Sequence, residues 1–212
     1  MSERILIASG AAELVGDVRG DGPPVVCLHA GVADRRVWAS VAGDLAARHR
    51  VYAYDRRGFG ETACTPESFS HVTDLGVVIE SIEAESVVLI GSSDGGRIAL
   101  DYALDHPEHV LALVLVAPAI SGEPPPDDLP PWVRKLDDAI EAAEEAGDLA
   151  EVNRLEAHLW LDGAAAPEGR VGGQDRALFF AMNERALTAP YAGEASRSPS
   201  AWERLNDLAV PT

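Results

Sequence analysis

The stretch Val87-Val88-Leu89-Ile90 runs directly into Gly91-Ser92-Ser93-Asp94-Gly95-Gly96, and this junction decides the fold. The first four residues are apolar and mostly β-branched, as in a strand that is buried on both faces. The next six fit the pattern Gly-any-Ser-any-Gly, in which a tight strand-to-helix turn exposes the middle serine above a sheet. The junction therefore predicts a strand, a sharp turn at Ser93, and a helix that begins at Asp94.

The chemistry of this turn favours Ser93 as a nucleophile. Side chains at Gly91 and Gly95 would collide with the neighbouring strand and helix, which explains why both positions are glycine. The positive end of the helix dipole lies behind Ser93 and stabilises negative charge that develops during a reaction. The alternative is an ordinary turn in which Ser93 or Asp94 only caps the helix.

Outward from the junction, apolar runs alternate with helical patterns. The other strands are predicted at residues 25–28, 51–54 and 111–116, and a hairpin is predicted over residues 6–19. Apolar residues recur at helical spacing in each interval between the central strands, and Pro107 ends the third helix. This order predicts the α/β class, with a doubly wound and mostly parallel sheet.

Composition changes at the proline-rich connector of residues 122–131. Beyond it the pattern is helical, with helices predicted at residues 132–146, 149–161 and 174–187 and a short one from Ser198. We therefore expect a core of residues 1–121, an inserted all-helical cap of residues 122–205, and the start of a returning core strand at residues 206–212.

Charge and composition exclude several function classes. The 35 acidic and 17 basic residues give a net charge of -18, which repels nucleic-acid phosphate and anionic lipid, so we expect neither partner. Lys135 is the only lysine and lies in no glycine-rich loop, which argues against a P-loop nucleotide site. Cys27 and Cys64 have neither a metal-ligand nor a redox spacing, and no signal peptide precedes the first strand, so we expect free thiols in a cytoplasmic protein.

A second loop supports the nucleophile. The strand of residues 25–28 leads into His29-Ala30-Gly31, and ligands of doubly wound sheets bind at the carboxyl ends of the strands. A backbone N–H of this loop, together with that of Asp94, could hold the oxyanion of a tetrahedral intermediate. Taken alone, the loop is equally consistent with a plain connection.

Together these stretches resemble the α/β-hydrolase fold superfamily over about residues 12–121. The matching pieces are Leu28 to Gly31 with Trp38 downstream, Tyr54 to Gly60, Gly91 to Gly96, and Leu113 to Pro118. The resemblance implies Ser93 as nucleophile, Asp94 and Gly31 as oxyanion donors, a helical cap, and neither a metal nor an organic cofactor. Ala30 departs from the family pattern, in which glycine is common at this position.

The same resemblance implies an acid and a histidine on loops after later strands. Residues 205–212 look like the approach to the first of those strands, so we expect both groups to lie beyond Thr212 and the last strands to be absent from this chain. Within the chain, His158 is a disfavoured alternative for the base and Glu123 for the acid. His106 and His109 are expected to be structural, and the acidic residues 137–148 to be a solvated helix face.

These observations predict a serine hydrolase that cleaves a small ester or related acyl substrate, and that is weak or inactive as this chain. The alternatives are a non-catalytic ligand-binding protein of the same fold, a haloperoxidase-like enzyme, or a carbon–carbon bond hydrolase. An in-frame continuation with Gly-any-any-Asp and a later histidine would favour the enzyme, and a stop codon after Thr212 would favour the binding protein. The substrate and the oligomeric state do not follow from the sequence.

Overall fold

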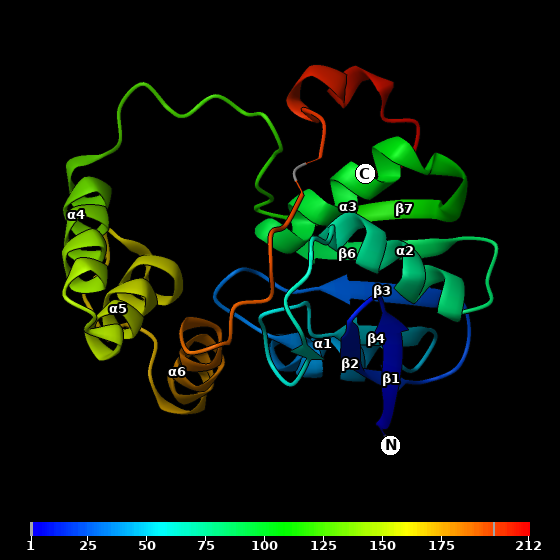
Figure 1. Ribbon diagram of the computed structural model, residues 1–212, viewed down its shortest axis with the longest axis horizontal. Helices are drawn as coiled ribbons and strands as arrows, with labels where there is room; N and C mark the ends of the chain where they lie inside the picture. Colours follow the sequence, from blue (N-terminus) through cyan, green and yellow to red (C-terminus); the bar gives the residue numbers. More distant parts are fainter. Residues whose placement is uncertain (1, 197) are drawn as a thin grey trace. The chain divides into compact units, whose positions relative to one another are not determined.

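The computed structural model describes residues 2–196 and 198–212. The chain divides into two compact units, one formed by residues 1–123 and 190–212 and the other by residues 124–189. The first contains the sheet and the second is helical (Figure 1). The helical unit is shorter than the expected cap of residues 122–205, because the segment from residue 190 onward packs with the sheet unit.

One mixed sheet contains seven strands of the described chain (Figure 1). Its main path runs in the spatial order β1 (Glu3–Ser9), β2 (Ala12–Arg19), β4 (Arg50–Tyr54), β3 (Pro24–Leu28), β6 (Val87–Ser92) and β7 (Val110–Val116), and β5 (Ala63–Cys64) pairs with β2. The hairpin strands β1 and β2 are antiparallel, whereas β4, β3, β6 and β7 run parallel. The predicted α/β class and the predicted central strands are therefore confirmed.

Alternating side chains of the strands enter two different cores. Val26 and Leu28 of β3 pack with helices α2 (His71–Ser81) and α3 (Asp94–Asp105), whereas Val25 and Cys27 pack with α1 (Ala39–Leu45) and the short turn η1 (Arg35–Trp38) before it. Because successive side chains of a strand point to opposite faces, these helices cover both sides of the sheet. Cys27 is buried and free, as expected, and burial raises the pKa of its thiol to about 12.

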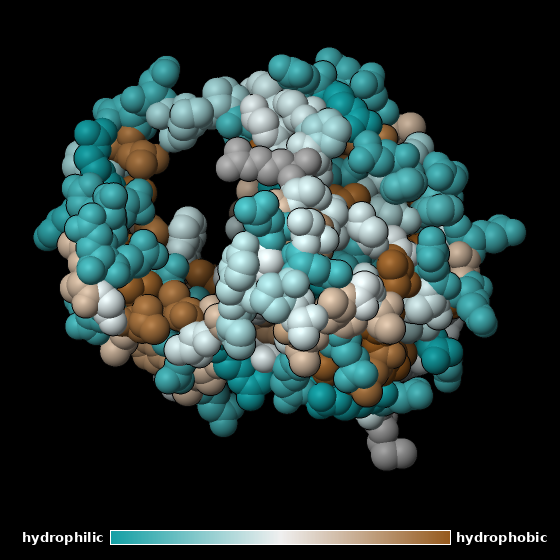
Figure 2. Space-filling model, in the orientation of Figure 1, coloured by the Kyte–Doolittle hydropathy of each residue, from teal (hydrophilic) through white to brown (hydrophobic). Residues whose placement is uncertain are grey.

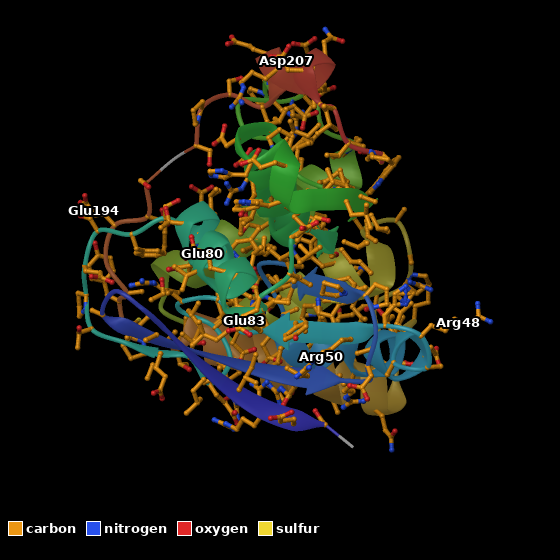
Figure 3. The ribbon with its side chains drawn as sticks, turned by 90° about the vertical axis from the view of Figure 1, so that its right-hand side faces the viewer. Arg48, Arg50, Glu80, Glu83, Glu194 and Asp207 are labelled. Atoms are coloured by element: carbon orange, nitrogen blue, oxygen red, sulfur yellow. The ribbon has the colours of Figure 1, made fainter. Side chains whose placement is uncertain are left out.

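The C-terminal segment is bound to the sheet unit by backbone hydrogen bonds. Phe69 N–H donates to the Glu194 carbonyl at 3.0 Å, and Ser196 N–H donates to the Phe69 carbonyl at 2.7 Å. Figure 3 shows the side chain of Glu194 directed away from the core. Further on, η4 (Trp202–Asp207) is a 3₁₀ helix, and residues 208–212 form no strand, although Leu113 N–H of β7 donates to the Pro211 carbonyl at 2.8 Å.

The helical unit has a small core of its own. Its helices are α4 (Pro131–Glu145), α5 (Leu149–Glu156), the π-helical continuation η3 (Ala157–Gly163) and α6 (Gly173–Leu187). Asp148 caps α5, since its carboxylate accepts the Glu151 N–H at 3.1 Å, as the sequence predicts. Leu136, Val152 and Leu155 are buried between the helices.

The face drawn in Figure 2 is mostly hydrophilic, with hydrophobic residues in separate areas. Among the helices of the described residues, none combines the length and apolar character that crossing a membrane requires.

A buried ion pair fixes the loop that follows β4. Asp55 is fully buried, and its carboxylate pairs with the Arg35 guanidinium and accepts the N–H groups of Arg35 and Glu61, each at 2.8 Å. The loop of residues 55–61 therefore leaves the end of the sheet in a defined direction.

Asp55→Ala should lower the free energy of unfolding by about 3 kcal/mol, because two buried N–H groups lose their acceptor and the Arg35 guanidinium keeps only its bonds to Asp17 and Glu61 among the described residues. Arg4→Ala is the matched control. It removes the exposed end of the same network, the pair Arg4–Glu61 at 2.7 Å, and should cost less than about 1 kcal/mol. Chemical denaturation measures both values, and similar losses in the two variants would contradict this view of the loop.

Candidate active site

Ser93 lies at a strained turn between β6 and α3. Its backbone has φ 50° and ψ −117°, a conformation that is costly for a residue with a side chain. Three backbone hydrogen bonds hold it there: Ser93 N–H donates to the Val116 carbonyl at 3.1 Å, and the Ser93 carbonyl accepts the N–H groups of Arg97 at 3.0 Å and Ala119 at 3.1 Å. The ends of β6, β7 and α3 thus jointly impose the turn predicted from the sequence.

Close backbone packing explains the glycines around Ser93. A Cβ atom at Gly91 would lie 2.5 Å from the Gly95 carbonyl oxygen and 2.6 Å from the Gly96 Cα. A Cβ at Gly95 would lie 2.6 Å from the His29 carbonyl oxygen. Glycine is therefore required at both positions, and it brings the turn against the loop that follows β3.

The two proposed oxyanion donors come from neighbouring strands. Leu28 of β3 lies in register with Gly91 of β6, so the loop through Gly31 and the turn at Ser93 leave the same end of the sheet. Asp94 is the first residue of α3, and its N–H has no hydrogen-bond acceptor among the described residues, as is normal at a helix N-terminus. Gly31 is exposed, and the space around its Cα is open.

His29 is a structural group of the loop after β3. It is fully buried, and its Nε2 accepts the Arg56 N–H at 3.2 Å, so the ring proton lies on Nδ1 and is donated to the Ala30 carbonyl at 2.8 Å. Burial and the nearby Arg56 guanidinium hold the pKa of His29 well below its ordinary value. The imidazole is therefore neutral and fixed, and it cannot serve as a mobile base for Ser93.

Arg56 connects the loop after β3 to the turn at Ser93. Only 1% of its side chain is exposed, and its guanidinium donates to Asp94 Oδ2 at 2.5 Å and to the His29 carbonyl at 3.3 Å. Phe59 packs against the guanidinium, 4.5 Å from its ring centroid to the Arg56 Cζ. One cation thus bonds to both segments that carry the expected oxyanion donors.

The Asp94 carboxylate is shared between two cations. Arg97 Nε donates to Asp94 Oδ1 at 2.7 Å, opposite the bond from Arg56. Burial disfavours the charged carboxylate, but Arg56 and Arg97 outweigh this effect and lower the pKa of Asp94. The two arginines therefore compensate the negative charge of the Asp94 carboxylate, which lies next to Ser93 in the chain.

A cavity of about 430 Å³ adjoins Arg97. Its polar lining consists of Arg97, His71 and the hydroxyls of Ser70, Ser121, Ser196 and Ser198. His71 begins α2, and its buried Nδ1 has no hydrogen-bond partner within the described chain. Burial, with the Arg56 charge as a second cause, lowers the pKa of His71 to about 3.

The Ser93 hydroxyl has no hydrogen-bond partner in residues 2–196 and 198–212, so these residues do not supply a preformed base or acid for it. His158 Nε2 is bonded to the Ala166 carbonyl at 2.9 Å within the helical unit, and Glu123 is exposed. The roles of Ser93, Asp94 and Gly31 stay predictions from the sequence.

Sequence reasoning missed the bond between Arg56 and Asp94. The segment Asp55-Arg56-Arg57-Gly58 was readable only as a turn, because nothing local shows which arginine points inward. In the structure Arg57 turns to Asp74, with Nε 2.9 Å from Oδ2, whereas Arg56 turns to Asp94. An acidic residue directly after the serine was the available signal that a buried cation is needed nearby.

Folding stability should depend on pH through His71. The folded state keeps this imidazole neutral down to about pH 3, whereas the unfolded chain binds a proton below about pH 6.5. The free energy of unfolding therefore falls as the pH falls from about 6.5 towards 3. His71→Asn should reduce the slope in this window by up to about 1.4 kcal/mol per pH unit, while both proteins have the same slope above pH 7. Denaturation at several pH values tests this, and unchanged slopes would show that the imidazole is not held neutral.

The amino-acid sequence is similar to those of known proteins. The sequence profile described as alpha/beta hydrolase fold matches residues 23–202. A pimeloyl-[acyl-carrier protein] methyl ester esterase of Aeromonas hydrophila is 36% identical over 98 residues, which are 46% of this chain and 39% of that protein. A 2-hydroxy-6-oxo-2,4-heptadienoate hydrolase of Pseudomonas putida is 35% identical over 121 residues, which are 53% of this chain and 43% of that protein. The chain thus spans about two fifths of the length of these curated relatives.

Solved structures extend the likeness in fold. A hydrolase from Pseudomonas aeruginosa PA01 has a TM-score of 0.71 at 23% identity, covering 99% of this chain and 78% of that one. The naproxen esterase (carboxylesterase NP) of Bacillus subtilis has a TM-score of 0.70 at 21% identity, covering 100% of this chain and 72% of that one. Because the sequence profile matches most of this chain, the chain belongs to the alpha/beta hydrolase fold family.

Proposed function

We propose that the protein is a serine hydrolase that cleaves a small ester or a related acyl compound, with Ser93 as its nucleophile. The observation that carries the proposal is the positive φ of 50° at Ser93, a strained conformation kept at the junction of β6 and α3. Strain of this kind persists where the surrounding structure enforces it, and it is concentrated at functional sites. An ordinary helix cap would not require it, because capping residues adopt extended backbone.

In the proposed reaction, Ser93 Oγ attacks the acyl carbon and forms a tetrahedral intermediate. The N–H groups of Asp94 and Gly31 donate to its oxyanion, which lowers the barrier because these dipoles are already oriented. Collapse of the intermediate releases the alcohol and leaves an acyl group on Ser93, which water then removes. The proton of Ser93 passes to a base that the described residues do not supply.

The charge next to the oxyanion supports this assignment. A free carboxylate at Asp94 would repel the negative charge that forms on the substrate. Arg56 and Arg97 both bond to this carboxylate, at 2.5 and 2.7 Å, so its field is largely cancelled. The helix N-terminus can then favour the oxyanion.

Names of relatives suggest the substrate class. The Aeromonas hydrophila relative is named a methyl ester esterase, and it favours an ester for this chain. We also propose that residues 124–189, the helical unit between β7 and the C-terminal segment, correspond to the inserted cap expected from the sequence.

Carbon–carbon bond hydrolysis is a second candidate. The Pseudomonas putida relative and a 2-hydroxymuconate semialdehyde hydrolase of Pseudomonas sp., 36% identical over 124 residues, both favour it. A substrate panel separates the two candidates: turnover of short-chain p-nitrophenyl esters alone supports the esterase, and cleavage of a 2-hydroxy-6-oxo-dienoate supports the second candidate.

A fluorophosphonate probe should label Ser93 slowly. Without a base the serine is weakly nucleophilic, although an oxyanion hole and binding alone still give about 10³–10⁴-fold over water in serine proteases. Intact-mass measurement follows the labelling, and peptide mapping locates it. Ser93→Ala should abolish the adduct.

Ser92→Ala is the matched control, because Ser92 is the last residue of β6 and directly precedes Ser93. This variant should be labelled at the wild-type rate. Labelling that persists in Ser93→Ala, or that is lost equally in Ser92→Ala, would refute the nucleophile assignment.

A further inference from the structure

A cluster of two imidazoles and a carboxylate lies at the opposite end of α3 from Ser93. One ring nitrogen each from His106 and His109 and a carboxylate oxygen of Glu108 all lie within 4.8 Å of one another. His106 Nδ1 is 3.8 Å from Glu108 Oε1. An α-helix rises 1.5 Å per residue, so the length of α3 separates this cluster from the turn at Ser93 by roughly 18 Å.

The backbone explains why the two histidines converge. His106 caps the C-terminal end of α3, with its N–H donating to the Tyr102 carbonyl at 2.8 Å, and residues Pro107–His109 form the 3₁₀ turn η2. His106 immediately precedes this turn and His109 ends it, so the turn brings the two histidines near one another. The rings of His106 and His109 are accordingly nearly parallel, with an interplanar angle of 14° and centroids 5.9 Å apart. Because Pro107 has a fixed φ, this arrangement is built into the turn.

Tyr102 supports the cluster from the protein side. It is buried, and its hydroxyl is hydrogen-bonded to His109 Nδ1 at 3.1 Å. The Tyr102 ring also packs against His106, with centroids 4.8 Å apart. Metal-bound imidazoles commonly have such an outer partner, which fixes the orientation of the ring.

The surrounding charge favours a cation. Asp105, the last residue of α3, and Glu108 of η2 place two carboxylates at this end of the helix. Arg204 of the C-terminal segment is paired with Asp105 at 2.8 Å, so its charge is compensated. The net charge of -18 adds a general attraction for cations.

We propose that His106, Glu108 and His109 form a binding site for a divalent transition-metal ion, with Zn²⁺ as the representative. Two imidazoles and one carboxylate suit Zn²⁺, whereas Mg²⁺ and Ca²⁺ prefer oxygen ligands. Ligand bonds of about 2.0–2.2 Å place neighbouring ligand atoms about 3.3 Å apart in a tetrahedral site. The side chains must therefore close by up to about 1.5 Å. The exposed side chains of His106 (47%) and Glu108 (62%) are free to do so.

Isothermal titration of the whole chain with ZnCl₂, in a buffer that does not chelate, tests the site. Wild type should bind one Zn²⁺ per chain with the residues of this cluster, and MgCl₂ should give no binding. His106→Asn and Glu108→Gln should each weaken Zn²⁺ binding at least tenfold. Because both side chains are exposed, these variants should keep the wild-type circular dichroism spectrum without metal.

Two further variants separate this cluster from a thiol site and test the role of Tyr102. Cys64→Ser removes the partly exposed thiol, a side chain with high affinity for Zn²⁺, and should bind Zn²⁺ as wild type does. Tyr102→Phe keeps the aromatic ring but removes the hydroxyl that orients His109, and it should weaken binding about tenfold. Absence of binding in wild type, binding that survives His106→Asn, or binding lost in Cys64→Ser would each overturn the proposal.

Discussion

The buried guanidinium of Arg56 constrains the whole candidate site. A cation with 1% of its side chain exposed is stable only if hydrogen-bond acceptors surround it, because desolvation costs several kcal/mol. The acceptors are the Asp94 carboxylate and the His29 carbonyl, one from each segment that carries a proposed oxyanion donor. Because both acceptors bond to the Arg56 guanidinium, this side chain holds the loop after β3 against the turn at Ser93. The same cation contributes to keeping His29 and His71 neutral, so the electrostatics of the region also depend on it.

Local sequence patterns were sufficient to predict the central strands, the turn at Ser93 and the end of α3. β3, β4, β6 and β7 are predictable because strands buried on both faces appear as continuous apolar runs. The turn at Ser93 is predictable because glycines at 91 and 95 are required by backbone contacts that any strand-to-helix turn of this kind makes. The end of α3 is predictable because Pro107 cannot continue it.

Long-range pairings were not predictable. Arg56 and Asp94 are 38 residues apart, and Arg56 and Arg57 cannot be distinguished until the fold shows which one faces the interior. The sequence around His71 does not show that its Nδ1 is buried, or that a cavity beside it includes residues from the C-terminal segment. His106 and His109 were expected to be structural, and only the 3₁₀ turn shows that their rings converge with Glu108.

A double-mutant cycle between Arg56 and Asp94 tests most directly whether this ion pair holds the site together. The free energies of unfolding of wild type, Arg56→Met, Asp94→Asn and the double variant are measured by chemical denaturation. Because either single change leaves the partner charge partly buried and without its bond, the pair should show a coupling energy of at least about 1.5 kcal/mol. Single losses that add to the double loss within about 0.5 kcal/mol would contradict the account.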